Sequence, residues 1–541
     1  MRPLPLLAVM LLAAGCSKAP DPGAGAPPKA AATATPALAA SAAAPAAAVE
    51  IAWEKGDVDA AFAKAKAENK PVFLYWGAVW CPPCNQVKAT IFNRQDFVER
   101  SRHFVPVYLD GDSKSAQRQG ARFKIGGYPT MILFTPDGTE ITRLPGEADA
   151  KQYMQVLALG LGGARPVKTT LAAALGKGGG TAQPALSGDD WRMLAYYSWD
   201  TDEQALIPKK DLAPTLRRLA QACPPSEVAT AARLKLKALA AESKAAGAKP
   251  ADDPATRDEI AKMLADPTIV RESFDLVTGY PREIAGQVSL PKTEGRAALV
   301  AAWDAVLSRL AADPALSAAD RLSAVGARID LAKLDAVDGK LPEALLAGAR
   351  EAAARGDRET TNPYARETVI NGAAYVLASA GLYAESDALL TAELARSSTP
   401  YYAMLGLASN AKKRGDKAGA VDWAEKAYAA AAGPATRLQW GVTYVNMLVD
   451  LTPEATARIE QAAGQVIAEL EPVPDTFYDR NHRYLERMAK KLADWNRDKP
   501  RQEAVKRMKT QLAGVCAKLP AGDPARKSCD GLWNASKGAA A

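Results

Sequence analysis

Two kinds of hydrophobic pattern divide this chain of 541 residues. Between residues 50 and 162, short apolar runs rich in β-branched and aromatic residues predict strands, and helical stretches fill the gaps between them. The predicted strands are residues 70–75, 105–109, 130–134 and 139–142, the last two joined as a hairpin by Pro136-Asp137-Gly138. From residue 189 to residue 541, Ala- and Leu-rich periodic stretches separated by Pro and Gly predict helices alone.

The helical part contains a repeated pattern, clearest in residues 364–431. Gly381 lies between two helical runs, and Gly415 occupies the same place 34 residues later. Ala420, Ala424 and Ala427 then provide small positions for close packing. The pattern resembles tetratricopeptide repeats, and because two units rarely bury enough surface alone, the resemblance implies that the flanking helices stack as divergent repeats. Further helical stretches are residues 296–310, 318–334 and 454–470.

The N-terminus predicts a membrane anchor. A short cationic start at Met1-Arg2 and an apolar core over residues 4–12, too short to cross a bilayer, lead to small residues before Cys16. Residues 1–15 therefore resemble a lipoprotein signal peptide, which implies a diacylated Cys16, and Ser17 after it favours the outer over the inner membrane. An ordinary secretory signal that leaves a free cysteine is the alternative.

Two stretches are predicted as linkers. Residues 16–49 consist largely of Ala, Pro and Gly with almost nothing to bury, so they predict a flexible tether. If mostly extended, at about 3.1 Å per residue, it would reach roughly 100 Å from the membrane. Residues 163–188 are the second predicted linker, between the strand-containing part and the helical part.

The sequence Trp80-Cys81-Pro82-Pro83-Cys84 directly follows the first long predicted strand. If Cys81 caps a helix, backbone N–H groups and the helix dipole stabilise its thiolate, while Pro82 and Pro83 suit the first turn. Cys84, one turn later, would then resolve a mixed disulfide. A static disulfide and half of a zinc site are the alternatives. Since His103 and His482 are the only histidines and no second such pair exists, no metal site and no cofactor is predicted.

The surroundings of this motif resemble the thioredoxin superfamily, in particular the bacterial branch that includes the C-terminal periplasmic domain of the transmembrane disulfide reductase. The resemblance is carried by Trp53 with the helix ending at residues 64–69, by the two-cysteine motif, by residues 127–130, and by Gly146. It implies an α/β thioredoxin fold over residues 50–162, a central mixed sheet flanked by helices, ahead of the large all-α region.

The resemblance also implies roles for individual residues. Cys81 and Cys84 become the catalytic pair. The proline that corresponds to Pro129 is cis in this family and lies beside the disulfide, so Trp80, Tyr128, Pro129 and Thr130 are the expected substrate-binding residues.

Two positions depart from the family pattern. The family commonly has a buried carboxylate six residues before the first cysteine, where this chain has Tyr75, so that base is missing. The related reductase domain tends to have an acid four residues after the second cysteine, where this chain has Lys88. One helical turn separates Cys84 from Lys88, which suggests that the ammonium group helps Cys84 to ionise; a solvated lysine without that role is the alternative.

The remaining cysteines predict structural roles. Cys516 and Cys529 lie thirteen positions apart around Pro520 and Pro524, and the oxidising periplasm favours a structural disulfide between them. Cys223 follows an amphipathic helix. It is predicted to be a buried free thiol, with an internal redox partner for Cys81 as the alternative.

Charge adds little. The formal net charge is +7, and the excess of Lys and Arg lies after residue 481. This basic end could contact anionic lipid or an acidic partner, although solvated helix faces are the favoured explanation. No aromatic interleaving or recognition motif indicates nucleic acid.

Together these patterns predict a lipid-anchored, periplasmic thiol-disulfide oxidoreductase. Its expected partners are disulfide-containing envelope proteins and an upstream electron donor, and Pro82-Pro83 favours the reductase direction over oxidase or isomerase activity. The helical repeats either present a concave surface to a client or partner, or merely pack on and space the catalytic domain. A helical adaptor whose redox-type head binds or senses partners without turnover is the alternative function.

Overall fold

The computed structural model describes residues 50–533 except for residues 56, 114–115, 145–148, 177–184, 200–205, 245–248, 337–338 and 471–473. These described residues all belong to one compact unit, Val49–Ala541. The predicted signal peptide, the tether over residues 16–49 with Cys16, and Gly146 lie outside the described residues.

The N-terminal part of this unit contains a five-stranded mixed sheet with the order β1-β3-β2-β4-β5. Strands β1, β3 and β2 run parallel, and β4 and β5 are antiparallel to their neighbours. The four predicted strands are confirmed, including the hairpin, whereas β1 is only two residues long and too short to give a pattern. The bounds are β1 Glu54–Lys55, β2 Val72–Gly77, β3 Val105–Asp110, β4 Thr130–Phe134 and β5 Glu140–Leu144.

Strand β2 is buried on both faces because it lies in the middle of the sheet. Phe73 and Tyr75 point into one core, which also holds Cys81 and Cys84. The alternate residues, such as Trp76, belong to a second core on the opposite face. This arrangement explains why β2 is a continuous apolar run and not an alternating one.

Short helices connect these strands. The turn into α2 brings the two-cysteine motif to the end of β2, and α2 continues directly into a π-helical turn, η1. Helix α1 shows why the ends are well defined: the Asp57 carboxylate accepts the Ala60 N–H, and Asn69 adopts the left-handed conformation after the last turn. The bounds are α1 Val58–Glu68, α2 Pro82–Val87, η1 Lys88–Phe92, α3 Gln95–Arg100, η2 Ser101–His103, α4 Ala116–Phe123 and α5 Ala150–Leu161.

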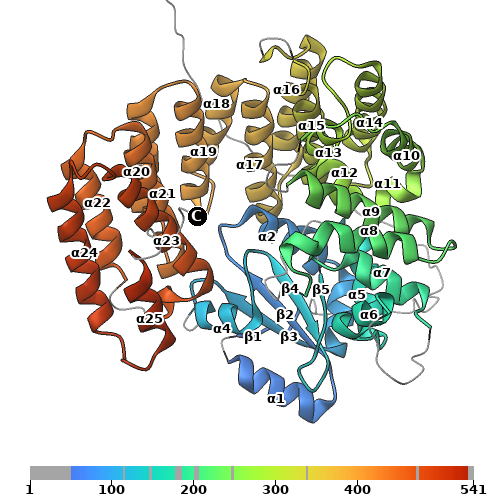
Figure 1. Cartoon of the computed structure of the whole chain (residues 1–541), viewed down its shortest axis with the longest axis horizontal. Helices are drawn as coiled ribbons and strands as arrows, with labels where there is room; N and C mark the ends of the chain where they lie inside the picture. The colour runs from blue at the N-terminus through green and yellow to red at the C-terminus, as the bar shows by residue number, and fades with distance from the viewer. Residues whose placement is uncertain are drawn as a thin grey trace, which may run out of the picture. The chain divides into compact units, whose positions relative to one another are not determined.

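The rest of the described chain is helical, as predicted. Figure 1 shows these helices following one another in an arc that begins against the sheet, passes α2 and returns to α4. Helix α17 contacts α2, and α23 contacts α4. The bounds are α6 Val167–Ala174, α7 Gly188–Tyr196, η4 Lys209–Asp211, α8 Leu212–Ala222, α9 Val228–Ser243, α10 Pro254–Ala265, α11 Pro267–Glu272, α12 Phe274–Gly279, α13 Pro281–Gln287, α14 Glu294–Ala312, α15 Ala318–Ala332, α16 Glu343–Glu359, α17 Pro363–Ser379, α18 Tyr383–Glu393, α19 Pro400–Lys413, α20 Lys417–Ala430, α21 Pro434–Leu451, α22 Thr456–Ala468, η6 Pro474–Phe477, α23 Asp479–Trp495, α24 Gln502–Ala517 and α25 Pro524–Gly531.

The stretch over residues 163–188 differs from the predicted linker. It contains α6, whose Val167 and Leu171 are buried. Helix α6 contacts α7 and β5, so this part of the stretch belongs to the fold. Helix α6 has only eight residues, too few for a helical period to stand out, which is why the pattern did not reveal it.

Gly381 and Gly415 lie between successive helices, α17 and α18 in the first case and α19 and α20 in the second. Both have positive φ values, 81° and 82°, which glycine adopts without strain at a helix end. Ala424 and Ala427 are fully buried on α20. Assignment of the region to tetratricopeptide repeats stays a prediction.

Across the described residues, none of the helices combines the length and apolar character needed to cross a bilayer.

Candidate active site

Cys81 occupies the N-cap position of α2. Its backbone is extended, its Sγ accepts the Cys84 N–H at 3.2 Å, and Pro82 and Pro83 fill the first helical positions. The Asn85 side chain braces the turn by donating to the Val79 carbonyl at 3.0 Å. The sulfur of Cys81 therefore lies where N–H groups and the positive helix end stabilise an anion.

Cys81 and Cys84 are joined as a disulfide, with their Cα atoms 5.2 Å apart. Neither residue is open to solvent: Cys81 is 3% exposed and Cys84 is fully buried. The pair is thus close enough for reversible exchange, but a reaction partner needs a path to it.

The loop before β4 lies beside this turn because Thr130 pairs with Trp76 in the sheet register. The Tyr128–Pro129 peptide bond in this loop is cis. The Tyr128 ring lies 6.0 Å from the Trp80 ring, and Thr130 is buried with its hydroxyl donating to the Gly127 carbonyl at 2.8 Å. The structure therefore brings Tyr128, which precedes the cis Pro129, against Trp80, the residue directly before Cys81.

Gly111 makes room for Tyr128. A Cβ atom at this position would lie 2.1 Å from the Tyr128 hydroxyl. A side chain at position 111 would therefore clash with the Tyr128 ring.

Tyr75 lies in the core beneath the motif, on the same face of β2 as the cysteines, and it is 1% exposed. Its ring stacks on Tyr108 at 5.2 Å, and Trp53 packs against it at 5.9 Å. Burial and the nearby Asp110 raise the Tyr75 pKa far above its ordinary value. A phenol held in its neutral form cannot take the proton from a resolving thiol, so Tyr75 does not replace the missing carboxylate as a base.

Lys88 begins η1 and lies one turn after Cys84, to whose carbonyl its N–H donates. Burial lowers the Lys88 pKa, and Asp110 opposes that shift. The ammonium lies 5.5 Å from the centre of the Tyr364 ring on α17. Lys88 is thus a partly desolvated cation whose backbone lies one helical turn after Cys84, and its influence on Cys84 stays a prediction.

Replacement of Lys88 by Met is expected to slow the resolution of a mixed disulfide by Cys84 about three- to tenfold near neutral pH. The reason is the loss of a cation that favours the Cys84 thiolate, an interaction of about 1 kcal/mol at this exposure. Stopped-flow measurement of leaving-thiol release gives the rate, and Lys88→Arg, which keeps the charge, is the control. An unchanged rate in Lys88→Met would show that the lysine has no part in the chemistry.

Trp80 is held by the helical region. Its indole Nε1 donates to the Thr436 hydroxyl of α21 at 2.7 Å. The Thr436 backbone N–H donates to Asp112 Oδ1 at 2.8 Å, and its hydroxyl donates to Asp112 Oδ2. This chain of hydrogen bonds joins the turn before α2, helix α21 and the turn that follows β3.

Aromatic rings and one cation complete the contact on Trp80. The Trp440 ring lies 4.6 Å from the Trp80 ring in an edge-on arrangement, and Tyr402 of α19 stacks on it at 6.1 Å. The guanidinium of Arg480 on α23 lies 4.4 Å from the Tyr128 ring and 5.8 Å from the Trp80 ring. We call Tyr402, Thr436, Trp440 and Arg480 the cover. It lies over the expected substrate-binding residues and keeps Trp80 at 7% exposure.

The helical region also contacts helix α2. The Thr368 hydroxyl of α17 donates to the Pro82 carbonyl at 2.6 Å. The Gln86 amide donates to Ser317 at 2.9 Å and to Asp320 at 3.0 Å. The helical region therefore contacts both the motif and the helix that follows it.

Asp112 gives the cover a pH dependence. Burial raises the Asp112 pKa, and the bonds from Thr436 oppose the shift. Because the folded-state pKa lies above the unfolded value, the native state binds this proton more readily. Its stabilising contribution is present below about pH 4 and is lost as pH rises through the folded pKa. In urea unfolding, we expect the free energy of unfolding of the wild-type protein, relative to that of Asp112→Asn, to fall as pH rises through this window and then to level off. A difference between the two proteins that does not change with pH would contradict this expectation.

Three further cysteines lie in the described part of the chain. Cys516 and Cys529 are bonded to each other, with their Cα atoms 5.6 Å apart. Cys223 is free and buried, and burial raises its pKa to about 11. A thiol that stays protonated at neutral pH is a poor nucleophile, which disfavours Cys223 as a redox partner. Among the described residues, no group of three or more His, Cys, Asp or Glu side chains is placed to hold a metal ion.

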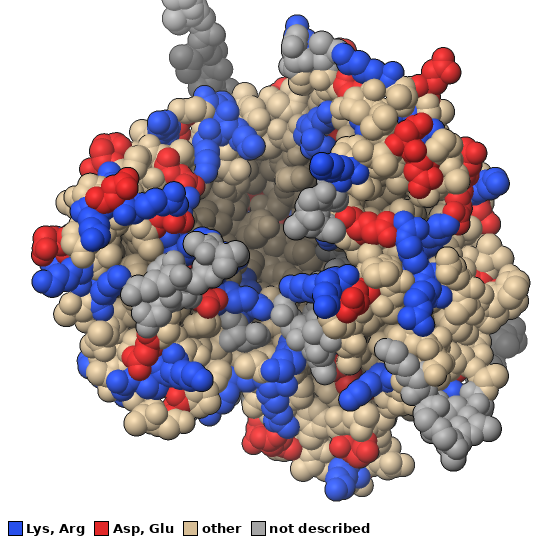
Figure 2. All heavy atoms as spheres, in the orientation of Figure 1, with Lys and Arg blue, Asp and Glu red and all other residues tan. Residues whose placement is uncertain are grey.

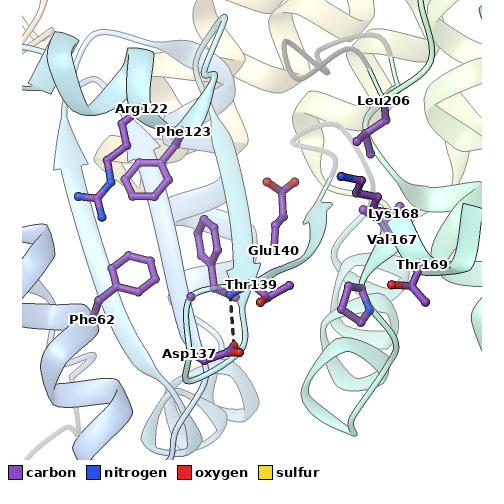
Figure 3. Close-up of a pocket in the computed structure, with 13 residues that line it drawn as sticks. Phe62, Arg122, Phe123, Asp137, Thr139, Glu140, Val167, Lys168, Thr169 and Leu206 are labelled. Carbon is purple, nitrogen blue, oxygen red and sulfur yellow. Dashed lines mark hydrogen bonds between the residues drawn. The ribbon is translucent and has the colours of Figure 1, made fainter.

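A cavity of about 620 Å³ lies near the second core, between the β4–β5 hairpin and α6 (Figure 3). Phe62 and Phe123 line one side of it and Lys168 the other, and Arg122 is paired with Asp59 at 2.6 Å. No cysteine lines it, so it is separate from the redox pair.

Comparison with known proteins agrees with this geometry. Residues 58–160 match the family described as "Thioredoxin-like domain". The chain is 33% identical over 89 residues to a protein named "Thioredoxin" from Mycobacterium bovis, covering 72% of that protein and 16% of this chain. The chain belongs to the thioredoxin family. Its thioredoxin domain is followed by a helical region that this match does not cover.

A second kind of relative is the "Thiol:disulfide interchange protein DsbD". The Pseudomonas fluorescens protein is 29% identical over 103 residues, which cover 18% of each chain. The match thus spans less than a fifth of the length of that relative. Among solved structures, "DsbH Oxidoreductase" is similar at 22% identity and a TM-score of 0.20, covering 22% of this chain and 90% of that one.

Proposed function

We propose that this protein is a membrane-anchored thiol-disulfide oxidoreductase on the periplasmic side of the cell envelope, where it reduces disulfides in envelope proteins. The observation that carries the proposal is the Cys81–Cys84 pair at the start of α2, with Cys81 as the N-cap and the cis Pro129 loop alongside. The name of the DsbD relatives and the lipoprotein-like signal ending before Cys16 support the activity and the location, with the outer membrane favoured.

The chemistry is a two-electron exchange. In the reduced protein, the Cys81 thiolate attacks one sulfur of a client disulfide, which breaks the client S–S bond, releases one client thiolate and forms a mixed disulfide. Cys84, as its thiolate, attacks Cys81 and releases the second client sulfur. The client takes up two electrons and two protons, and the Cys81–Cys84 bond forms. An upstream dithiol donor must then reduce that bond before the next cycle.

The direction follows from the residues between the cysteines. Pro82 and Pro83 place no cation beside the Cys81 thiolate, so the residues between the cysteines add nothing to the stabilisation of that thiolate by the helix terminus. A reduced form without extra stabilisation makes the disulfide a weaker oxidant. We expect a reduction potential nearer to that of thioredoxin, about −270 mV, than to the strong periplasmic oxidants at about −120 mV.

An insulin-reduction assay with dithiothreitol as the donor tests the proposal, together with equilibration against glutathione to measure the potential. Catalytic turnover with a potential below about −200 mV supports a reductase. Turnover with a potential near about −120 mV would indicate an oxidase instead of a reductase. Absence of turnover would contradict the proposal that the protein is an enzyme.

A second candidate is favoured by the cover. Because Trp80 and Cys81 are buried under the helical region, the domain could act as an adaptor whose thioredoxin head binds or senses partners without turnover. The same assay separates the two, since an adaptor gives no insulin reduction even when its disulfide is reduced beforehand.

A further inference from the structure

A groove of about 840 Å³ lies directly against the active-site helix. Pro82, Pro83 and Gln86 of α2 form one part of its lining, and helices α12, α15, α17 and α19 supply most of the rest. Figure 2 shows this hollow in the middle of the molecular face, with mostly uncharged walls and charged side chains around its rim. Its volume is within the range of protein ligand sites.

Among the described residues, the lining combines apolar side chains with polar ones and carries no lysine or arginine. Side-chain amides and hydroxyls, such as Asn371, Ser409 and Gln439, lie among glycines and alanines. Of the aspartates in the lining, Asp275 and Asp330 are each paired with a basic side chain that does not line the groove. Such a surface offers hydrogen bonds to neutral polar groups and no partner for an anion.

An exposed aromatic residue is part of the same groove. Tyr375 on α17 is 61% exposed, an unusual position for a large ring in a folded protein. It provides an apolar surface on which a side chain of an incoming chain can pack.

We propose that this groove binds an extended, uncharged or basic segment of the client polypeptide next to its disulfide. This inference rests on the proposed function and names its substrate class. An extended main chain presents alternating N–H and C=O groups, which match the amides and hydroxyls of the lining. The floor of the groove is the active-site helix itself, so a bound segment lies beside the catalytic pair.

The cover also favours an extended client segment, because it excludes a folded client from the active site. A folded protein surface cannot dock on Trp80 and Tyr128 while Thr436, Trp440 and Arg480 lie over them. Tyr402 both lines the groove and stacks on Trp80, so it forms the wall between the groove and the redox site. A segment in the groove therefore reaches Cys81 by displacing Tyr402, and an extended chain fits where a folded domain does not.

Filling the groove tests the proposal. Gly372 lines it in the middle of α17, and a Cβ there meets only Leu322 at an ordinary 3.9 Å, so Gly372→Leu extends into the groove without a backbone clash. Gly348 in α16 has open space around it and gives the matched control, Gly348→Leu. Tyr375→Ala provides an independent second variant.

Three substrates are compared with dithiothreitol as the donor: 2-hydroxyethyl disulfide, a quenched fluorescent cystine peptide with Ser, Gly and Ala flanks, and the same peptide with Asp and Glu flanks. We expect Gly372→Leu to lower kcat/KM on the neutral peptide at least tenfold, mainly through KM, and Tyr375→Ala to lower it at least threefold. Both should leave 2-hydroxyethyl disulfide unaffected, and Gly348→Leu should behave as wild type. The acidic peptide should be at least fivefold poorer than the neutral one in the unmutated protein.

Unchanged reduction of the neutral peptide by Gly372→Leu, or equal reduction of the acidic and neutral peptides, would overturn the groove as the client site. An equal loss on 2-hydroxyethyl disulfide would show that the variant damages the redox pair and would equally remove the proposal. Failure of the wild-type protein to reduce 2-hydroxyethyl disulfide is a different result, since it contradicts the proposed function itself.

Discussion

Serine at position 81 is expected to abolish insulin reduction, with a loss of at least about 10³-fold. The attacking thiolate is the only nucleophile that the N-terminus of α2 stabilises, and a serine hydroxyl stays protonated at neutral pH. The measurement is dithiothreitol-driven turbidity after insulin reduction, corrected for the uncatalysed rate.

Serine at position 84 is expected to give a different outcome. Cys81 can still attack, but no thiol within the protein resolves the mixed disulfide, so the pre-reduced variant, freed of dithiothreitol, accumulates clients on Cys81. Insulin turnover falls because only external dithiothreitol can then release the client. Non-reducing electrophoresis followed by mass spectrometry should find a covalent adduct that dithiothreitol releases. Cys223→Ser is the matched control and should retain wild-type turnover, because the Cys223 thiol is buried with its pKa raised to about 11. Equal activity of Cys81→Ser and the wild type would eliminate the proposed mechanism.

The sequence pattern predicts what depends on neighbours along the chain. Strands β2 to β5 are visible as apolar runs, and the N-cap position of Cys81 follows from the strand-to-helix spacing and the two prolines. Strand β1 and helix α6 were missed because each is too short to show a period. The resemblance to thioredoxins supplied the one local feature that the pattern could not, the cis bond before Pro129.

The cover could not be predicted in this way. Trp80 and its partner Thr436 are 356 positions apart, and nothing near Thr436 distinguishes it from other helix-start residues. Asp112 follows the end of a predicted strand, so the sequence could predict that it lies near the site. The sequence could not predict that Thr436 is its hydrogen-bond partner. The effect of Lys88 is similar: spacing placed it one turn after Cys84, whereas its burial depends on α17. Contacts between distant segments depend on how the arc of helices packs against the sheet. No local stretch of sequence predicts that packing.

The cover makes access to the disulfide depend on opening. Cys81 is 3% exposed while the cover is in place. We therefore expect the rate at which a small thiol reduces the disulfide to be proportional to the fraction of molecules in which the cover has moved away from Trp80. Thr436→Val removes the hydroxyl that accepts from Trp80 and donates to Asp112, while keeping the shape of the side chain. Losing these two hydrogen bonds, one of them to a carboxylate, favours the open state by about 2 kcal/mol.

Thr436→Val is therefore expected to raise the rate of reduction of the Cys81–Cys84 bond by dithiothreitol about thirtyfold. Stopped-flow tryptophan fluorescence or quenched-flow alkylation measures this rate, and Thr436→Ser, which keeps the hydroxyl, should stay within about threefold of wild type. The urea dependence of the rate separates local opening from global unfolding, because global unfolding exposes far more surface and makes the rate rise steeply with urea, whereas local opening leaves it nearly constant. If Thr436→Val and wild type are reduced at the same rate, the contact with Trp80 does not limit access to the sulfurs. The groove beside Pro82 would then admit a thiol directly, and the helical region would guide clients without restraining the redox pair.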